Sequence, residues 1–251
     1  NSAYGPVKNP LNPLLTPGGS SGGCAAAISA KLCHISLGSD TGGSVRQPAS
    51  FCGVIGLKPS YGMISRHGLI AYASSFDQIG PLGTSTYDID KVMEIISGRD
   101  DFDSTCVFNR HDYKKEFSPI TKMKISVIKE VTNHSLIHPD VKKSFELLIS
   151  NIKKSGHDIN FVEMPILKYL VPSYYVLTTA EASSNLARYD GIKYGFSERV
   201  NTNNWEELVQ KTRSKGFGPE VKRRILLGSF VLSEGYYDDY YTKAQKVRRI
   251  V

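Results

Sequence analysis

Two glycine-serine tracts carry the side chains of this sequence that could do covalent chemistry. They are Gly18–Gly23 (GGSSGG) and Asp40–Ser44 (DTGGS), with Ser20 and Ser44 as the candidate nucleophiles. A serine hydroxyl attacks a carbonyl effectively only when a neighbouring group accepts its proton. N–H donors must also receive the charge that develops on the carbonyl oxygen. The second tract offers successive N–H groups on small residues, so the two tracts together predict a serine-dependent acyl-transfer site.

Several other interpretations fit parts of these tracts. Flexible Gly-Ser linkers normally join domains and do not flank a short Ala-rich helix, whereas tight turns without chemistry stay open as an alternative. A P-loop needs a lysine that neither tract has. GGSSG matches the G-x-S-x-G turn of α/β-hydrolases, but Pro13 and Pro17 argue against the strand that should precede it. Asp40-Thr41-Gly42 resembles half of an aspartic protease site, and no second triplet is present.

Neither tract has an evident general base beside it. His34 is the histidine nearest to the tracts, and it falls between a predicted helix and a predicted strand, which fits a structural histidine better. Ser44 is expected at the start of a helix, where the helix dipole favours negative charge. A proton relay that does not use histidine is therefore required.

The elements that must position these tracts alternate between strand and helix. Strands are predicted over 35–38, 53–57, 124–130 and 160–162. Helices are predicted over 24–31, 86–97, 139–155, 168–190, 204–214 and 219–251. This alternation indicates an α/β layered fold.

The bulk composition is that of an ordinary globular protein. The 251 residues, 40% of them hydrophobic, suffice for one large α/β domain or two small ones. The four cysteines form no C-x-x-C pair, which leaves zinc or thioredoxin chemistry unsupported. No apolar run reaches the roughly 18 residues of a membrane span, and 1–10 does not resemble a signal peptide. The net charge of +7 fits solvated helix faces better than a nucleic-acid surface.

The two tracts also extend into a longer pattern. GSSGG at Gly19–Gly23 is followed by GSDTGGSVRQP at Gly38–Pro48, and the pair resembles the amidase signature family. The resemblance implies an α/β fold with a central mixed, twisted β-sheet and helices on both faces. It also implies a single amidase-signature domain over 1–251, which we expect to be truncated at both ends. No metal site is expected.

The family's catalytic group is a Ser–Ser–Lys triad. The resemblance implies that Ser44 is the nucleophile and that Ser20, which follows a cis peptide bond, is the bridging serine. The oxyanion hole would be formed by the backbone N–H groups of Thr41, Gly42, Gly43 and Ser44. Asp40 and Arg46 would support this loop. The triad lysine has no match and is expected ahead of Asn1, so we expect the chain alone to be nearly inactive.

Further stretches resemble one branch of the family, the A subunits of aspartyl/glutamyl-tRNA amidotransferases. They are 1–10, 65–83, 180–195 and 216–228. Members of this branch release ammonia from glutamine, and B and C subunits use it with ATP and magnesium to amidate misacylated tRNA. The resemblance implies a glutamine amidohydrolase subunit that serves Glu-tRNA(Gln), Asp-tRNA(Asn) or both, without a cofactor of its own. It also implies a cytoplasmic location, with an organelle as the alternative, and no membrane partner.

Glutamine would be bound by Tyr174 and Arg224, whose guanidinium suits a bidentate contact with the α-carboxylate. An acidic residue for the α-amino group would lie after Val251. The main alternative is a stand-alone amidase-signature hydrolase of small amides. A catalytically silent assembly subunit is a second alternative, and a nucleic-acid-binding module, supported by charge alone, is a third.

Overall fold

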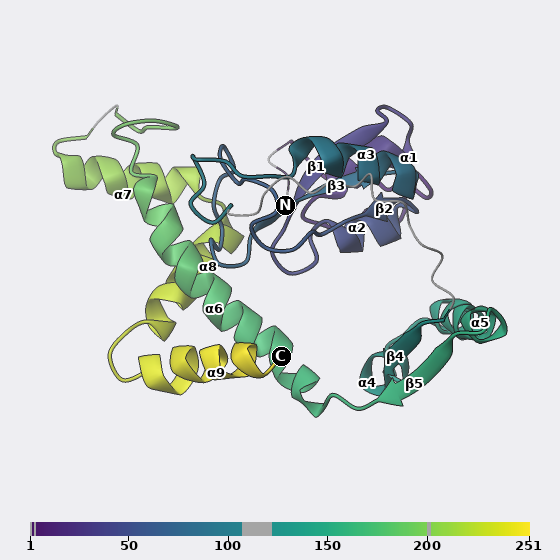
Figure 1. The fold of residues 1–251 in the computed structure, drawn as a ribbon. Coiled ribbons are helices and arrows are strands. Elements are labelled where there is room, and N and C mark those ends of the chain that lie inside the picture. Colours follow the sequence, from purple (N-terminus) through teal and green to yellow (C-terminus); the bar gives the residue numbers. More distant parts are fainter. Residues whose placement is uncertain (1, 3, 107–121, 200–201) are drawn as a thin grey trace. The chain divides into compact units, whose positions relative to one another are not determined.

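The computed structural model describes residues 2, 4–106, 122–199 and 202–251, which form two compact units. Unit 1 consists of Asn1–Tyr113 and Val176–Tyr241, and unit 2 of Lys114–Tyr175 and Thr242–Val251. Each unit combines helices with strands, as Figure 1 shows. The predicted α/β class is therefore confirmed.

Unit 1 is built around an antiparallel sheet. Its strands are β1 (Ile35–Asp40), β2 (Ile55–Gly56) and β3 (Gln78–Gly83), in the order β1-β3-β2 (Figure 1). The central strand β3 was not predicted, because Pro81 and the two glycines of QIGPLG weigh against a strand. Pro81 nevertheless takes part in the sheet, since its carbonyl oxygen accepts a 3.0 Å hydrogen bond from the Leu57 amide.

Helices cover both faces of this sheet. They are α1 (Gly22–Ser29), α2 (Arg46–Phe51) and α3 (Thr86–Ile96). Leu82 of β3 packs with Ile28 of α1 and Ala49 of α2, whereas Ile79 packs against the cluster around Ile89 of α3. Side chains alternate between the two faces along a strand. Hence α1 and α2 lie on one face and α3 on the other, as predicted.

The C-terminal part of unit 1 is helical. It contains α6 (Leu170–Asn185, which continues into unit 2), η2 (Leu186–Arg188), α7 (Trp205–Gly216), α8 (Pro219–Val231) and η3 (Tyr237–Thr242). α8 approaches α6 closely at Gly228, where an added Cβ would lie 2.0 Å from the Thr179 carbonyl oxygen. The helix predicted over 219–251 is interrupted after Val231, and Gly235 adopts φ +84° in the break.

Unit 2 contains a parallel strand pair. Its elements are β4 (Lys124–Ile128), α4 (Lys129–Thr132), α5 (Pro139–Lys154), β5 (Asp158–Val162), η1 (Pro165–Tyr169) and α9 (Lys243–Ile250). β4 and β5 pair in parallel, which requires a crossover that α5 supplies. The described strands thus include both antiparallel and parallel pairs, in separate sheets. No helix within the described residues is long and apolar enough to cross a membrane.

Candidate active site

The two glycine-serine tracts meet in unit 1. The first tract leads into α1, and the second connects β1 to α2, which begins two residues after Ser44. The Ser21 amide donates a 3.0 Å hydrogen bond to the Ser44 carbonyl oxygen. The Gly19–Ser20 peptide bond is cis, as the family resemblance implied. Ser20 is exposed and Ser44 half-buried, so the structure brings the two predicted catalytic serines onto adjoining backbone segments.

Two further contacts fasten the first tract. The Ser21 hydroxyl donates to the Ser39 carbonyl and accepts from the Ser39 amide, both at 3.2 Å. A Cβ on Gly38 would lie only 2.6 Å from the Ser21 Oγ, so this approach requires glycine. On the other side, the Gly19 amide donates a 3.2 Å hydrogen bond to the Gln47 Oε1. The first tract is thereby tied both to the end of β1 and to α2.

Asp40 organises the second tract. Its carboxylate is fully buried and accepts hydrogen bonds from the Gly43 amide at 2.7 Å and the Val45 amide at 3.1 Å. The Arg46 guanidinium donates to both carboxylate oxygens, from Nε at 3.0 Å and from Nη2 at 3.1 Å. The turn from Asp40 to Arg46 is therefore held by one carboxylate.

The charge of Asp40 is stabilised despite its burial. Burial disfavours ionisation, but the hydrogen bonds from Arg46, Gly43 and Val45 outweigh it and keep the pKa of Asp40 below its usual value of 3.8. The same contact raises the pKa of Arg46. The loop is thus held by a fully ionised pair at neutral pH.

The Gly43 amide has a partner inside the loop. It is one of the four amides predicted to donate to a substrate oxyanion, together with those of Thr41, Gly42 and Ser44. In the structure it donates to Asp40 at 2.7 Å, so it also shapes the loop. The role of these four amides as oxyanion donors stays a prediction.

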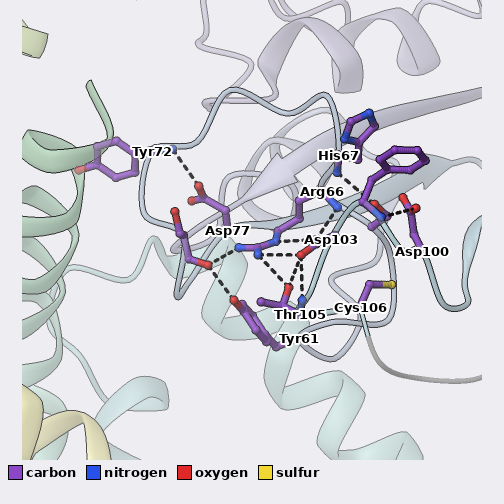
Figure 2. A network of polar contacts seen from close by, with 12 residues as sticks. Tyr61, Arg66, His67, Tyr72, Asp77, Asp100, Asp103, Thr105 and Cys106 are labelled. Atoms are coloured by element: carbon purple, nitrogen blue, oxygen red, sulfur yellow. Dashed lines mark hydrogen bonds and ion pairs between the residues drawn. The ribbon is translucent and has the colours of Figure 1, made fainter. Parts of the chain in front are cut away.

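Asp77 connects the second tract to the loop that precedes β3. Its buried carboxylate accepts from the Thr41 hydroxyl at 2.7 Å through Oδ1. Its Oδ2 accepts from the amides of Tyr72 and Ala73 at 2.8 and 2.9 Å. Figure 2 shows the Asp77 carboxylate facing the Tyr72 backbone. One carboxylate thus fixes Thr41 relative to Tyr72.

The loop from Tyr61 to Asp77 is held by a polar network (Figure 2). The Arg66 guanidinium bonds to Asp103 at 3.1 Å and to the Ser74 carbonyl, which also accepts from the Tyr61 hydroxyl at 2.8 Å. The hydrogen bond from Arg66 is the main reason why the pKa of Asp103 lies far below its usual value. This loop therefore has a defined backbone on which Tyr72 is carried.

The predicted substrate arginine lies next to Tyr72. Arg224 is on α8, and its Nη1 donates a 2.9 Å hydrogen bond to the Tyr72 hydroxyl while its Nε donates a 2.9 Å bond to Glu220. Arg224 and the second tract are thus linked through Tyr72 and Asp77. Tyr174 lies on α6 in unit 2, and its place in the site stays a prediction.

The residues that fasten this site were not singled out from the sequence. They are Ser21, Gln47, Tyr72 and Asp77. Gln47 lies inside the signature, and Tyr72 and Asp77 lie inside the stretch 65–83 that resembles the amidotransferase branch. These three residues therefore lie inside motifs that resemble the family, but their residue types alone did not indicate what they do.

The family model for amidases matches residues 1–251. The A subunit of glutamyl-tRNA(Gln) amidotransferase from Koribacter versatilis is 52% identical over 253 residues, which cover 100% of this chain and 52% of that protein. The crystal structure of the A subunit of glutamyl-tRNA(Gln) amidotransferase from Thermotoga maritima matches with a TM-score of 0.73 and 43% identity, covering 99% of this chain and 49% of that one. A crystal structure described as an amidase matches with a TM-score of 0.74 and 27% identity, over 99% of this chain and 49% of that one. The chain spans about half the length of the curated relatives that it matches.

Proposed function

The chain belongs to the amidase family, and we propose that it is part of the glutamine-hydrolysing A subunit of a glutamyl-tRNA(Gln) amidotransferase. The observation that carries this proposal is the similarity to amidotransferase A subunits, which extends over the whole chain at 52% identity. Among the solved structures, the Thermotoga maritima amidotransferase A subunit is 43% identical to this chain, whereas the structure described as an amidase is 27% identical. We also propose that 1–251 belongs to a single amidase-signature domain, because one family match extends over all of these residues.

In the proposed reaction, the Ser44 hydroxyl attacks the side-chain carbonyl of glutamine. Ser20 accepts the proton of Ser44 and passes its own to a neutral lysine, which the family resemblance places ahead of Asn1. The proton then returns to the leaving nitrogen, the C–N bond breaks and ammonia is released. Water hydrolyses the acyl-enzyme to glutamate and restores Ser44.

The backbone geometry supports this reaction. The hydrogen bond from the Ser21 amide to the Ser44 carbonyl keeps the two proposed catalytic serines, Ser20 and Ser44, on adjoining segments. The amides of Thr41, Gly42, Gly43 and Ser44 are the proposed oxyanion donors, on a loop that Asp40 holds by its contacts to Gly43 and Val45. A preorganised donor loop lowers the barrier because it needs no rearrangement when the charge develops.

Substrate recognition is proposed to rest on Arg224 and Tyr174. The guanidinium of Arg224 would bind the glutamine α-carboxylate, a contact whose planar geometry lysine does not reproduce. The released ammonia would be used by partner subunits, B and C in the family branch, to amidate Glu-tRNA(Gln) with ATP and magnesium. ATP and magnesium therefore belong to the complex in this proposal.

The proposal is tested by ammonia release from glutamine. The full-length protein, co-expressed with its partner subunits, would be compared with Ser44→Ala and Ser20→Ala. Both variants are expected to lose at least about 1,000-fold in rate, because each interrupts the same relay. Ser50→Ala is the matched control, since Ser50 is an exposed serine on α2, and it is expected to retain the wild-type rate.

The outcomes separate the alternatives. Ammonia release retained by Ser44→Ala would show that Ser44 is not the nucleophile and would favour the G-x-S-x-G interpretation of Ser20. Loss in Ser44→Ala with full activity in Ser20→Ala would remove the serine relay. Equal rates on glutamine and on small amides, without dependence on partner subunits, would indicate the stand-alone amidase. A wild-type complex that releases no ammonia would indicate a silent subunit that serves assembly only.

A further inference from the structure

Tyr72 lies between Arg224 and Asp77, the residue that binds the proposed oxyanion loop at Thr41. Its backbone amide is held by Asp77, and its hydroxyl receives the hydrogen bond from Arg224. The Arg224 guanidinium also lies over the Tyr72 ring, with 5.3 Å between Cζ and the ring centroid, so both the polar end and the face of this tyrosine contact the arginine.

The hydrogen-bond directions follow from the groups involved. A guanidinium only donates, so the Tyr72 hydroxyl accepts from Arg224, and its own proton is available for the Thr178 hydroxyl at 3.3 Å. Thr178 is fully buried on α6, which limits the rotation of the phenol. Glu220 holds the Nε side of the same guanidinium, one helical turn before it on α8. The plane of Arg224 is thus set by partners from two different segments.

From this arrangement, we infer that Tyr72 is a positioning residue for substrate selection. It orients the Arg224 guanidinium toward the α-carboxylate of glutamine. Through Asp77, which binds Thr41 at 2.7 Å and the Tyr72 amide at 2.8 Å, it also keeps that guanidinium at a fixed separation from the oxyanion loop. This inference rests on the proposed glutaminase function.

The separation matters because glutamine has a fixed length between its two ends. The α-carboxylate and the side-chain amide must be bound together for the amide carbon to lie beside the Ser44 hydroxyl. A rigid link between the carboxylate-binding group and the oxyanion loop therefore selects glutamine over amides that lack the carboxylate. Binding of the α-carboxylate by Arg224 therefore also positions the side-chain amide for attack.

The test compares glutamine with 4-aminobutanamide, which is glutamine without its α-carboxylate. Steady-state ammonia release would be measured for the full-length protein in its complex. Tyr72→Phe is expected to raise the KM for glutamine about three- to tenfold, the size of one ordinary hydrogen bond, because the guanidinium keeps its bond to Glu220. Its kcat for glutamine is expected to stay within about twofold, and its kcat/KM for 4-aminobutanamide is expected to be unchanged.

Tyr87→Phe is the matched control. It removes the hydroxyl of an exposed tyrosine on α3, outside the loop that carries Tyr72. Its KM for glutamine is expected to equal that of the wild type. Arg224→Lys should reproduce the substrate dependence of Tyr72→Phe with a larger rise in KM. Thermal melting of each variant would establish that it is folded.

The link through Asp77 is tested separately. Asp77→Asn is expected to lower kcat for both amides, because it loosens Thr41 as well as Tyr72. An Asp77→Asn variant with wild-type kcat on both amides would show that this link is wrong.

The remaining outcomes distinguish two failures. If Arg224→Lys raises the KM for glutamine and Tyr72→Phe does not, the inference about Tyr72 is overturned while the proposed function stands. An equal loss of kcat/KM on both amides in Tyr72→Phe would also overturn it, because the effect would then be structural. If the wild type does not prefer glutamine to 4-aminobutanamide, the proposed function fails and the inference fails with it.

Discussion

The Ser21 amide donates a 3.0 Å hydrogen bond to the carbonyl oxygen of Ser44. This contact joins the loop before α1 to the loop after β1, and it places the two predicted catalytic serines on adjoining segments. The Ser21 side chain adds a second attachment, to both backbone polar groups of Ser39. Ser21 has no role in the family triad, yet it fixes the geometry on which a serine relay would depend.

Replacing Gly38 should disturb this attachment. In Gly38→Ala the new Cβ would lie 2.6 Å from the Ser21 Oγ and 2.8 Å from its Cβ, so Ser21 must move. We expect the free energy of unfolding to fall by about 1–3 kcal/mol and kcat to fall as well. Gly23→Ala is the control for stability, because nothing lies within 4 Å of its added Cβ on α1. Urea denaturation and steady-state ammonia release of the full-length protein measure the two effects, and equal stabilities would contradict the prediction.

The Asp40–Arg46 pair should contribute more to the free energy of unfolding than an exposed ion pair does. Asp40→Asn removes a fully buried charge that accepts hydrogen bonds from Arg46 and from two loop amides. We expect a loss of about 2 kcal/mol in unfolding free energy and a lower kcat, because the oxyanion loop loses its anchor. The control is Asp101→Asn, whose partner Arg99 and whose own side chain are both largely exposed, and there the change should stay below about 1 kcal/mol. Denaturant titration would reveal whether the two variants differ.

Asp103 should make stability depend on pH on the acid side. Its pKa in the folded protein is lowered, mainly by the hydrogen bond from Arg66, below the ordinary 3.8. A lowered folded pKa contributes stability that is present above the unfolded pKa and is lost as pH falls through the folded value. The stability difference between wild type and Asp103→Asn should therefore be full at pH 7 and shrink below about pH 4. Unfolding curves from pH 7 to about pH 3 measure it, and a difference that does not change with pH would refute this assignment.

The close packing of α8 on α6 should depend on Gly228. A Cβ there would lie 2.0 Å from the Thr179 carbonyl oxygen, which is backbone and cannot rotate away. Gly228→Ala should cost about 2 kcal/mol or more in stability and raise the KM for glutamine, since Arg224 is one turn earlier on α8. Gly218→Ala, with nothing within 4 Å of its added Cβ, should change stability by less than about 1 kcal/mol. A Gly228→Ala variant as stable as Gly218→Ala would disprove the packing argument.

The local sequence determined much of the secondary structure. Strong patterns such as the helix that begins at Pro139, and the strand predicted around Asn160, were found near their observed bounds, α5 and β5. β3 was missed because its proline and glycines disfavour a strand in isolation, while pairing on both sides overrides that preference. The helix predicted over 219–251 was too long. Gly235 weakens a helix locally, but one glycine does not by itself predict the break that the structure shows there.

The sequence by itself also determined the family, because the spacing of the two serine tracts and the residues around Ser44 form a pattern too long to arise by chance. The same resemblance named Asp40 and Arg46 as the residues that support the loop. Only the tertiary structure decided that the Gly43 amide binds Asp40, and that Tyr72 contacts Arg224 across 152 positions of sequence. The physical reason is that these contacts depend on hydrogen-bond geometry between segments far apart in the chain. Residue types and local spacing set which elements can form, but they do not set which donor meets which acceptor once those elements pack together.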